Sequence, residues 1–197
     1  MCFYFFFVKM FFLKLYKKEQ MGVKHINGSA RAKWWDYSDS GTYFITICTK
    51  DKIPYFGNFR DCKVQLTKVG EIVSEEWLKT GELRNEMKVD LHEFVIMPDH
   101  FHALISIGIN PFNGKDSFMN ESGGYKNNDF KPQSNNLGSI VRGFKSAVTT
   151  RCKKTDLPFC WQPRYYDVII KSKDQFENVQ QYILDNPRRH AMRRVPT

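Results

Sequence analysis

The segment from residue 89 to residue 107, VDLHEFVIMPDHFHALISI, constrains the fold more than any other part of the sequence. It contains two apolar runs, 89–97 and 100–107, and the Pro98-Asp99 pair between them is typical of a turn. Two strands joined by so short a turn pair as an antiparallel hairpin. The chain is therefore expected to build its core around an antiparallel sheet.

Two histidines, His100 and His102, lie one residue apart in the second of these strands. Successive side chains of a strand point to opposite faces, so both imidazoles are expected on one face, with Phe101, Ala103 and Ile105 on the other. Two imidazoles held side by side can supply half of a metal site. They can equally be polar residues on the solvent-facing side of a half-buried strand, and the spacing alone leaves both interpretations open.

Further periodic segments set the fold class. The order is strand, helix, two strands, helix, strand and a terminal helix. It predicts an α+β fold: a ferredoxin-like (split βαβ) antiparallel sheet with helices on one face, plus a C-terminal helix. Because a residue before proline disfavours the helical region, the last helix is expected to end before Pro187. The additional expected strands are 42–50 and 164–172, and the expected helices are 69–79, 137–154 and 173–186.

The 197 residues are enough for one domain with a substantial core. Residues 21–197 are predicted to form it, interrupted at 110–136 by a stretch rich in Asn, Gly and Ser that is typical of a flexible insertion. Residues 1–20 form a Phe-rich extension that is broken by two lysines and is too short to span a bilayer. We interpret it as a mis-called start upstream of Met21; the alternative is a segment lying on a membrane surface.

Charge and cysteine content narrow the function class. The net charge is +9, with basic residues concentrated in 151–154 and 187–194 and acidic residues in 71–93. This uneven distribution favours a nucleic-acid partner over solubility alone. The cysteines number five and include no C-x-x-C motif, so they indicate reduced thiols in a cytoplasmic protein.

The terminal helix carries a second candidate pair. Tyr182 and Asn186 are four residues apart and therefore lie on one face, beside the apolar stripe of Val179 and Ile183. A tyrosine with its hydroxyl in water and an asparagine near a helix end also fit the edge of a core. Composition alone favours that structural role.

Four segments, in order along the chain, resemble the IS200-like single-tyrosine transposases, most closely the REP-associated tyrosine transposases of the HUH endonuclease superfamily. They are GTYFITICTKDKIPYFG, EFVIMPDHFHALI, LGSIVRGFKSAV and FCWQPRYYDVIIKSKDQFENVQQYILDNP. The resemblance runs from about residue 28 to residue 190 and is broken only by the polar insertion. Asp99 departs from the pattern, since Asn is more usual at that position.

The resemblance implies a metal-dependent single-stranded DNA endonuclease and strand transferase that acts next to DNA hairpins. Tyr182 would be the nucleophile and form a 5′-phosphotyrosine link. His100, His102 and Asn186 would hold a divalent ion, Mg²⁺ or Mn²⁺. Single-stranded or hairpin DNA would be the partner, no membrane is expected, and some relatives are homodimers whereas others act alone. The basic residues expected to contact phosphates are Arg142, Lys145, Arg151, Lys153, Lys154, Arg188 and Arg189.

Three alternatives stay open. A domesticated relative would bind DNA hairpins without cutting them, and a metal-dependent phosphohydrolase would use water, so that Tyr182→Phe would leave turnover largely intact. If the histidines are structural and the charge serves RNA binding, metal affinity would not depend on His100. Rival nucleophiles by chemistry are Tyr165 and Tyr166, and candidate base-stacking groups are Trp34, Trp35, Tyr37 and Trp161, although the tryptophans fit a core at least as well.

Overall fold

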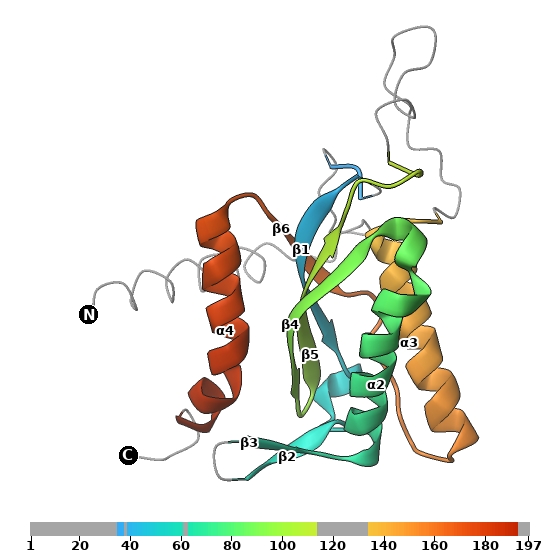
Figure 1. Cartoon of the computed structure of the whole chain (residues 1–197). Coiled ribbons are helices and arrows are strands. Elements are labelled where there is room, and N and C mark those ends of the chain that lie inside the picture. The colour runs from blue at the N-terminus through green and yellow to red at the C-terminus, as the bar shows by residue number, and fades with distance from the viewer. Residues whose placement is uncertain (1–34, 38, 61–62, 114–133, 193–197) are drawn as a thin grey trace, which may run out of the picture. The chain divides into compact units, whose positions relative to one another are not determined.

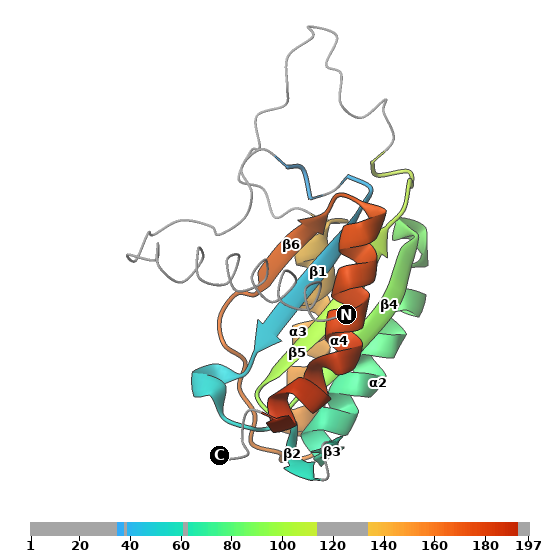
Figure 2. The ribbon, with the colours of Figure 1, turned by 90° about the vertical axis from the view of Figure 1, so that its left-hand side faces the viewer.

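A computed structural model describes residues 35–37, 39–60, 63–113 and 134–192. Within these residues a four-stranded sheet has helices on both faces, two on one side and one on the other (Figures 1 and 2). The extension at 1–20, most of the predicted insertion and Trp34 lie outside the described residues.

The sheet has the strand order β4-β5-β1-β6, and every neighbouring pair is antiparallel. The strands are β1 (Gly41–Cys48), β4 (Val89–Met97), β5 (His100–Ile107) and β6 (Tyr166–Ile170). In chain order this is the split βαβ arrangement, in which the first and last strands of the motif lie side by side. The predicted α+β, ferredoxin-like fold class is confirmed.

Helices α2 (Lys68–Leu83) and α3 (Leu137–Lys154) pack side by side on one face of the sheet. Each begins at a residue that caps it: Gly70 N–H donates to the Thr67 hydroxyl at 3.2 Å, and Asn136 forms a capping box with Ser139. The core beneath them is aromatic. The Trp77 ring lies 5.0 Å from that of Phe101 and 5.2 Å from that of Phe144.

Helix α4 (Lys173–Met192) lies against the opposite face, beside β4 and β5 (Figure 2). The prediction that it ends at Asn186 is wrong, because the helix continues through Pro187. The last turns make contacts of their own: the His190 ring stacks on Phe59 at 4.5 Å, and Arg189 pairs with Asp185 at 3.5 Å. These contacts offset the helical hydrogen bond that proline cannot donate.

Three short features were not predicted: two 3-10 turns and a hairpin. After β1 the chain makes a 3-10 turn, η1 (Lys50–Lys52), so the strand expected to reach residue 50 ends at Cys48. A two-stranded hairpin, β2 (Gly57–Arg60) with β3 (Lys63–Leu66), then leads into α2. A second 3-10 turn, η2 (Asn85–Met87), connects α2 to β4.

Both ends of the predicted flexible insertion are ordered. Asn110 is buried, and its amide donates to the carbonyls of Met87 at 3.1 Å and Gly108 at 2.9 Å. Asn113, also buried, donates to the same Gly108 carbonyl. At the other end Asn136 caps α3, so only residues 114–133 of the predicted insertion lie outside the described part.

Among the described residues, no helix has both the length and the apolar content that a bilayer crossing requires.

Candidate functional site

The alternation of β5 divides its side chains between the two faces of the sheet. Phe101 is fully buried and contacts Trp77 and Phe144 from α2 and α3. His102 points the other way, where its ring lies 5.7 Å from that of Tyr182 on α4. The rings of His100 and His102 are 4.7 Å apart, which confirms that the two imidazoles share a face.

His100 is oriented by the residue before it. Its Nδ1–H donates to the Asp99 carboxylate at 2.6 Å. This hydrogen bond is the largest influence on the pKa of Asp99 and lowers it, against the opposing effect of partial burial. With Nδ1 engaged, Nε2 is the nitrogen of His100 that remains for a ligand.

His102 is held across the sheet. Its Nδ1 lies 2.8 Å from the hydroxyl of Thr46, the residue paired with it on β1. Burial, together with the nearby His100, holds the pKa of His102 well below its usual value. The imidazole is therefore neutral at neutral pH, which is the form that binds a metal ion.

Tyr182 projects from α4 into an aromatic contact with this pair. Its ring packs edge-on against Phe44 at 6.0 Å as well as against His102, and the side chain is half-buried. The Arg189 guanidinium lies 5.9 Å from the centre of the Tyr182 ring. A guanidinium at this distance from a ring centre makes a cation–π contact.

Asn186 completes the predicted set. It lies one helical turn after Tyr182 on α4 and is buried, with 7 % of its surface exposed. Within the described residues, no group of three or more His, Cys, Asp or Glu side chains is placed to hold a metal ion. A metal site here therefore needs an oxygen of another kind beside the two imidazoles, and the Asn186 amide is the predicted source.

The predicted phosphate-binding residues divide between two places. Those on α3 lie on the face of the sheet away from His102 and Tyr182. Of these, Arg151 pairs with Glu75 at 2.7 Å and Glu76 at 2.8 Å, and the Lys145 ammonium donates to the Gln162 carbonyl at 2.8 Å and the Arg164 carbonyl at 3.1 Å. The α3 residues Arg142, Lys153 and Lys154 are exposed, as is Arg188 on α4, whereas Arg189 is half-buried.

The candidate stacking residues lie mostly in the core. Trp161 and Tyr37 are buried, and Trp35 donates from Nε1 to the Tyr43 hydroxyl at 3.0 Å. Of the rival tyrosines, Tyr166 is 46 % exposed on β6 and Tyr165 is half-buried just before it.

Two residues of the site were not predicted. Thr46 binds His102 because β1 and β5 are in register, and Phe44 packs against both His102 and Tyr182. The sequence predicted only that residues 42–50 form a strand, and this prediction does not indicate which strand pairs with it.

Comparison with known proteins gives three results. No protein-family model matches the chain. The solved structure of a REP-associated tyrosine transposase bound to a REP hairpin is similar, with 20 % identity, 83 % of this chain and 74 % of that chain covered, and a TM-score of 0.49. A Haemophilus influenzae protein described only as uncharacterized is 35 % identical over 171 residues, which cover 86 % of this chain and 92 % of that protein. The chain therefore belongs to the same protein family as this Haemophilus influenzae protein.

Proposed function

We propose that the chain is a metal-dependent single-stranded DNA nicking and rejoining enzyme of the single-tyrosine transposase type. The observation that carries the proposal is that the ring centres of Tyr182 and His102 lie 5.7 Å apart. Tyr182 is on α4, and the sequence indicated it as the nucleophile only through the family resemblance. Tyr182 thus lies beside one of two neighbouring imidazoles, and the buried Asn186 follows one helical turn later. These residue types suit metal-assisted transfer of a phosphoryl group to a tyrosine.

The residues present fit a divalent ion. Asp99 engages Nδ1 of His100 and Thr46 engages Nδ1 of His102, which leaves the two Nε2 atoms for a ligand. Asn186, buried on α4, would supply an amide oxygen. Two imidazole nitrogens with an amide oxygen suit Mn²⁺ or Mg²⁺. When bound, the ion would polarise the scissile phosphate and stabilise charge on the leaving oxygen.

The reaction assigned to Tyr182 is a transfer of the phosphoryl group. Its hydroxyl oxygen attacks phosphorus and its proton leaves to solvent. The bond from phosphorus to the 3′ oxygen breaks, and that oxygen takes up a proton, which leaves a free 3′-hydroxyl and a 5′-phosphotyrosine. Because the covalent link conserves the phosphodiester, the strand can be rejoined by the reverse attack without another energy source.

Arg189 supports this step from the same helix. Its guanidinium lies 5.9 Å from the centre of the Tyr182 ring and pairs with Asp185 at 3.5 Å, and its remaining N–H groups would donate to the incoming phosphate. Arg188, exposed at the adjacent position of α4, would contact a DNA phosphate farther along the strand.

The test compares wild type with Tyr182→Phe, using Mn²⁺ and labelled single-stranded DNA from the flanks of its own gene. We expect a metal-dependent covalent protein–DNA adduct on a denaturing gel, reduced at least about a hundredfold in the variant because the attacking oxygen is gone. The matched control is Tyr166→Phe, which removes an exposed hydroxyl and should leave the adduct unchanged.

The other outcomes identify the rivals. An adduct that persists in Tyr182→Phe places the nucleophile elsewhere. Cleavage without any adduct indicates attack by water, and tight hairpin binding without cleavage indicates a DNA-binding relative.

A further inference from the structure

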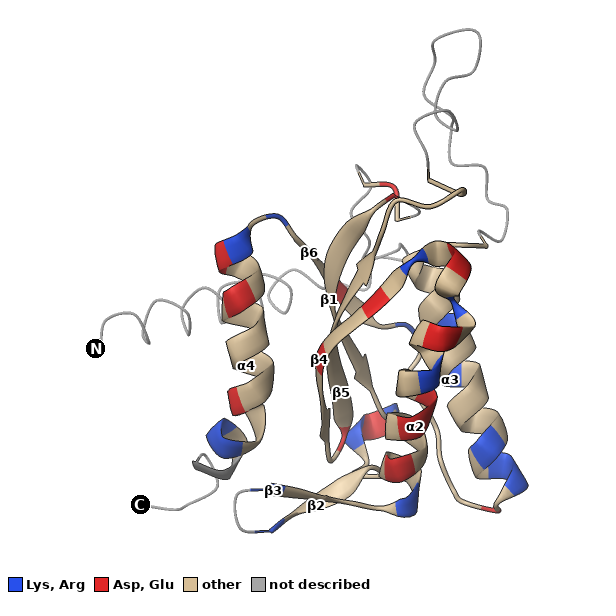
Figure 3. Ribbon diagram, viewed as in Figure 1, with Lys and Arg blue, Asp and Glu red and all other residues tan. Residues whose placement is uncertain are grey.

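Exposed cations gather at the end of the sheet where β1 stops and the β4–β5 turn lies. They come from three elements: the η1 turn, the β2–β3 hairpin and the last turns of α4 (Figure 3). We call this set the end cluster, and its members are Lys50, Lys52, Arg60, Lys63 and Arg188. Within the described residues none of these five forms an ion pair.

The η1 turn has a strained backbone. Asp51 and Lys52 are consecutive residues with φ of 53° and 54°, a left-handed conformation that is unfavourable for residues other than glycine. Thr49 holds the turn: it is fully buried, and its hydroxyl donates to the carbonyls of Ile53 at 2.8 Å and Asp99 at 3.0 Å. The turn is therefore fixed to the backbone of the residue that orients His100.

This anchoring places a lysine near the candidate site. The Lys52 N–H donates to the Thr49 carbonyl at 3.3 Å, and the Thr49 N–H donates to the Asp99 carbonyl at 3.0 Å. Lys52 itself is exposed. Its ammonium is therefore open to a ligand, on a turn whose backbone is bonded to the residue that orients His100.

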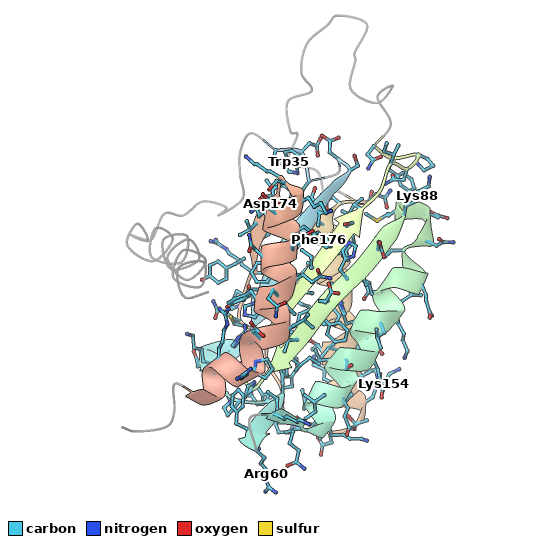
Figure 4. The ribbon with its side chains drawn as sticks, turned by 60° about the vertical axis from the view of Figure 1, so that its left-hand side comes forward. Trp35, Arg60, Lys88, Lys154, Asp174 and Phe176 are labelled. Carbon is cyan, nitrogen blue, oxygen red and sulfur yellow. The ribbon has the colours of Figure 1, made fainter. Side chains whose placement is uncertain are left out.

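The hairpin reaches the same region from below. Arg60 and Lys63 are paired residues at its tip, and Figure 4 shows the Arg60 side chain extending away from the fold. The stacking of Phe59 on His190 joins the hairpin to the end of α4, where Arg188 is exposed two residues earlier. The η1 turn and the hairpin, which are neighbours in the sequence, and the distant end of α4 therefore present cations around one end of the sheet.

We infer that the end cluster binds the phosphates of single-stranded DNA that approaches Tyr182, an inference that rests on the proposed function of that site. A run of phosphates neutralises spaced, unpaired cations, and a flexible single strand can follow cations that project from several elements. The competing surface is α3, where the exposed cations are Arg142, Lys153 and Lys154 on the other side of the sheet.

The test removes three charges from each surface in the full chain carrying Tyr182→Phe, so that no covalent step intervenes. One variant carries Lys52→Gln, Arg60→Gln and Lys63→Gln, and its matched control carries Arg142→Gln, Lys153→Gln and Lys154→Gln. Fluorescence anisotropy with a labelled oligonucleotide gives Kd between about 50 and 200 mM salt. Loss of three contacts should reduce the slope of log Kd against log salt by about 2 in the first variant, with little change in the control.

The inference would be overturned if the two variants had equal slopes, or if the slope fell more in the control variant. It would also be overturned if the parent chain did not bind DNA. Tighter binding of polyglutamate than of DNA would overturn it in favour of an acidic protein partner. If thermal melting shows that the triple variant does not fold, Arg60→Gln alone should reduce the slope by about 0.7. The covalent adduct assay tests the proposed function separately. An adduct together with unchanged slopes would support the enzyme and contradict the DNA-binding role of the end cluster. A reduced slope without any adduct would support that role and contradict the enzyme.

Discussion

Asp99 determines which nitrogen of His100 faces a ligand, because its carboxylate holds Nδ1–H at 2.6 Å. We predict that Asp99→Ala weakens Mn²⁺ affinity about 10- to 100-fold, the usual effect of losing a group that orients a metal-binding histidine. Asp99→Asn should weaken it less, since the amide oxygen still accepts the hydrogen bond. Titration followed by the electron paramagnetic resonance of free Mn²⁺ measures both.

The matched control is Asp90→Ala, which removes a carboxylate 3.9 Å from a different histidine, His92. Its Mn²⁺ affinity should equal that of wild type. A larger loss in Asp90→Ala than in Asp99→Ala would show that the carboxylates act through general charge and not by orienting His100.

The sequence predicted the residues of the candidate site but not all of their neighbours. Alternation along β5 placed His100 and His102 on one face, and helical spacing placed Tyr182 beside Asn186. Thr46 was not predicted, because its contact with His102 depends on the register between two strands that are far apart in the sequence. The ion pairs of Arg151 were missed for the same reason, since they join two helices.

At the scale of elements, β4, β5 and α3 coincide with the ranges expected from the sequence. Their patterns are long, and a turn or a capping residue marks their ends. The β2–β3 hairpin was missed because strands of four residues carry too little alternation to be recognised. The end of α4 was placed wrongly because contacts with the hairpin outweigh the local effect of Pro187.

Pro187 is expected to lower the stability of α4. Proline lacks the N–H that an interior helical residue donates, so we predict that Pro187→Ala raises the free energy of unfolding by about 1 to 3 kcal/mol. Chemical denaturation measures the change. The control is Lys173→Ala at the exposed first residue of the same helix, where little change is expected. A less stable Pro187→Ala protein would contradict the prediction. It would mean that packing of the half-buried proline ring stabilises the fold more than the restored hydrogen bond does.

At the scale of the whole molecule, Tyr43 links stability to alkaline pH. It is fully buried, and desolvation raises its pKa to about 12 despite the opposing hydrogen bond from Trp35. An unfolded tyrosine loses its proton near pH 10, so above that pH the unfolded state is favoured progressively until the folded tyrosine also ionises. Ionisation of Tyr43 should therefore lower the free energy of unfolding by about 2 to 3 kcal/mol as the pH rises from about 10 to 12.

Denaturant unfolding of wild type and Tyr43→Phe at several pH values tests this. The variant is expected to be less stable at neutral pH, because it loses the hydrogen bond from Trp35, and to lose less stability between about pH 10 and 12. The control, Tyr166→Phe on the exposed side of β6, should keep the wild-type pH dependence. Parallel curves for wild type and Tyr43→Phe would contradict the prediction.

Strand β5 gives one face to the core and the other to the candidate site. A slip of one residue against β1 would turn both histidines toward α2 and α3 and bring Phe101 beneath Tyr182. Such a misfolded sheet would lose its largest aromatic contacts and its imidazole pair in a single step. The aromatic packing that disfavours the shifted register therefore also keeps both imidazoles on the face that Tyr182 covers.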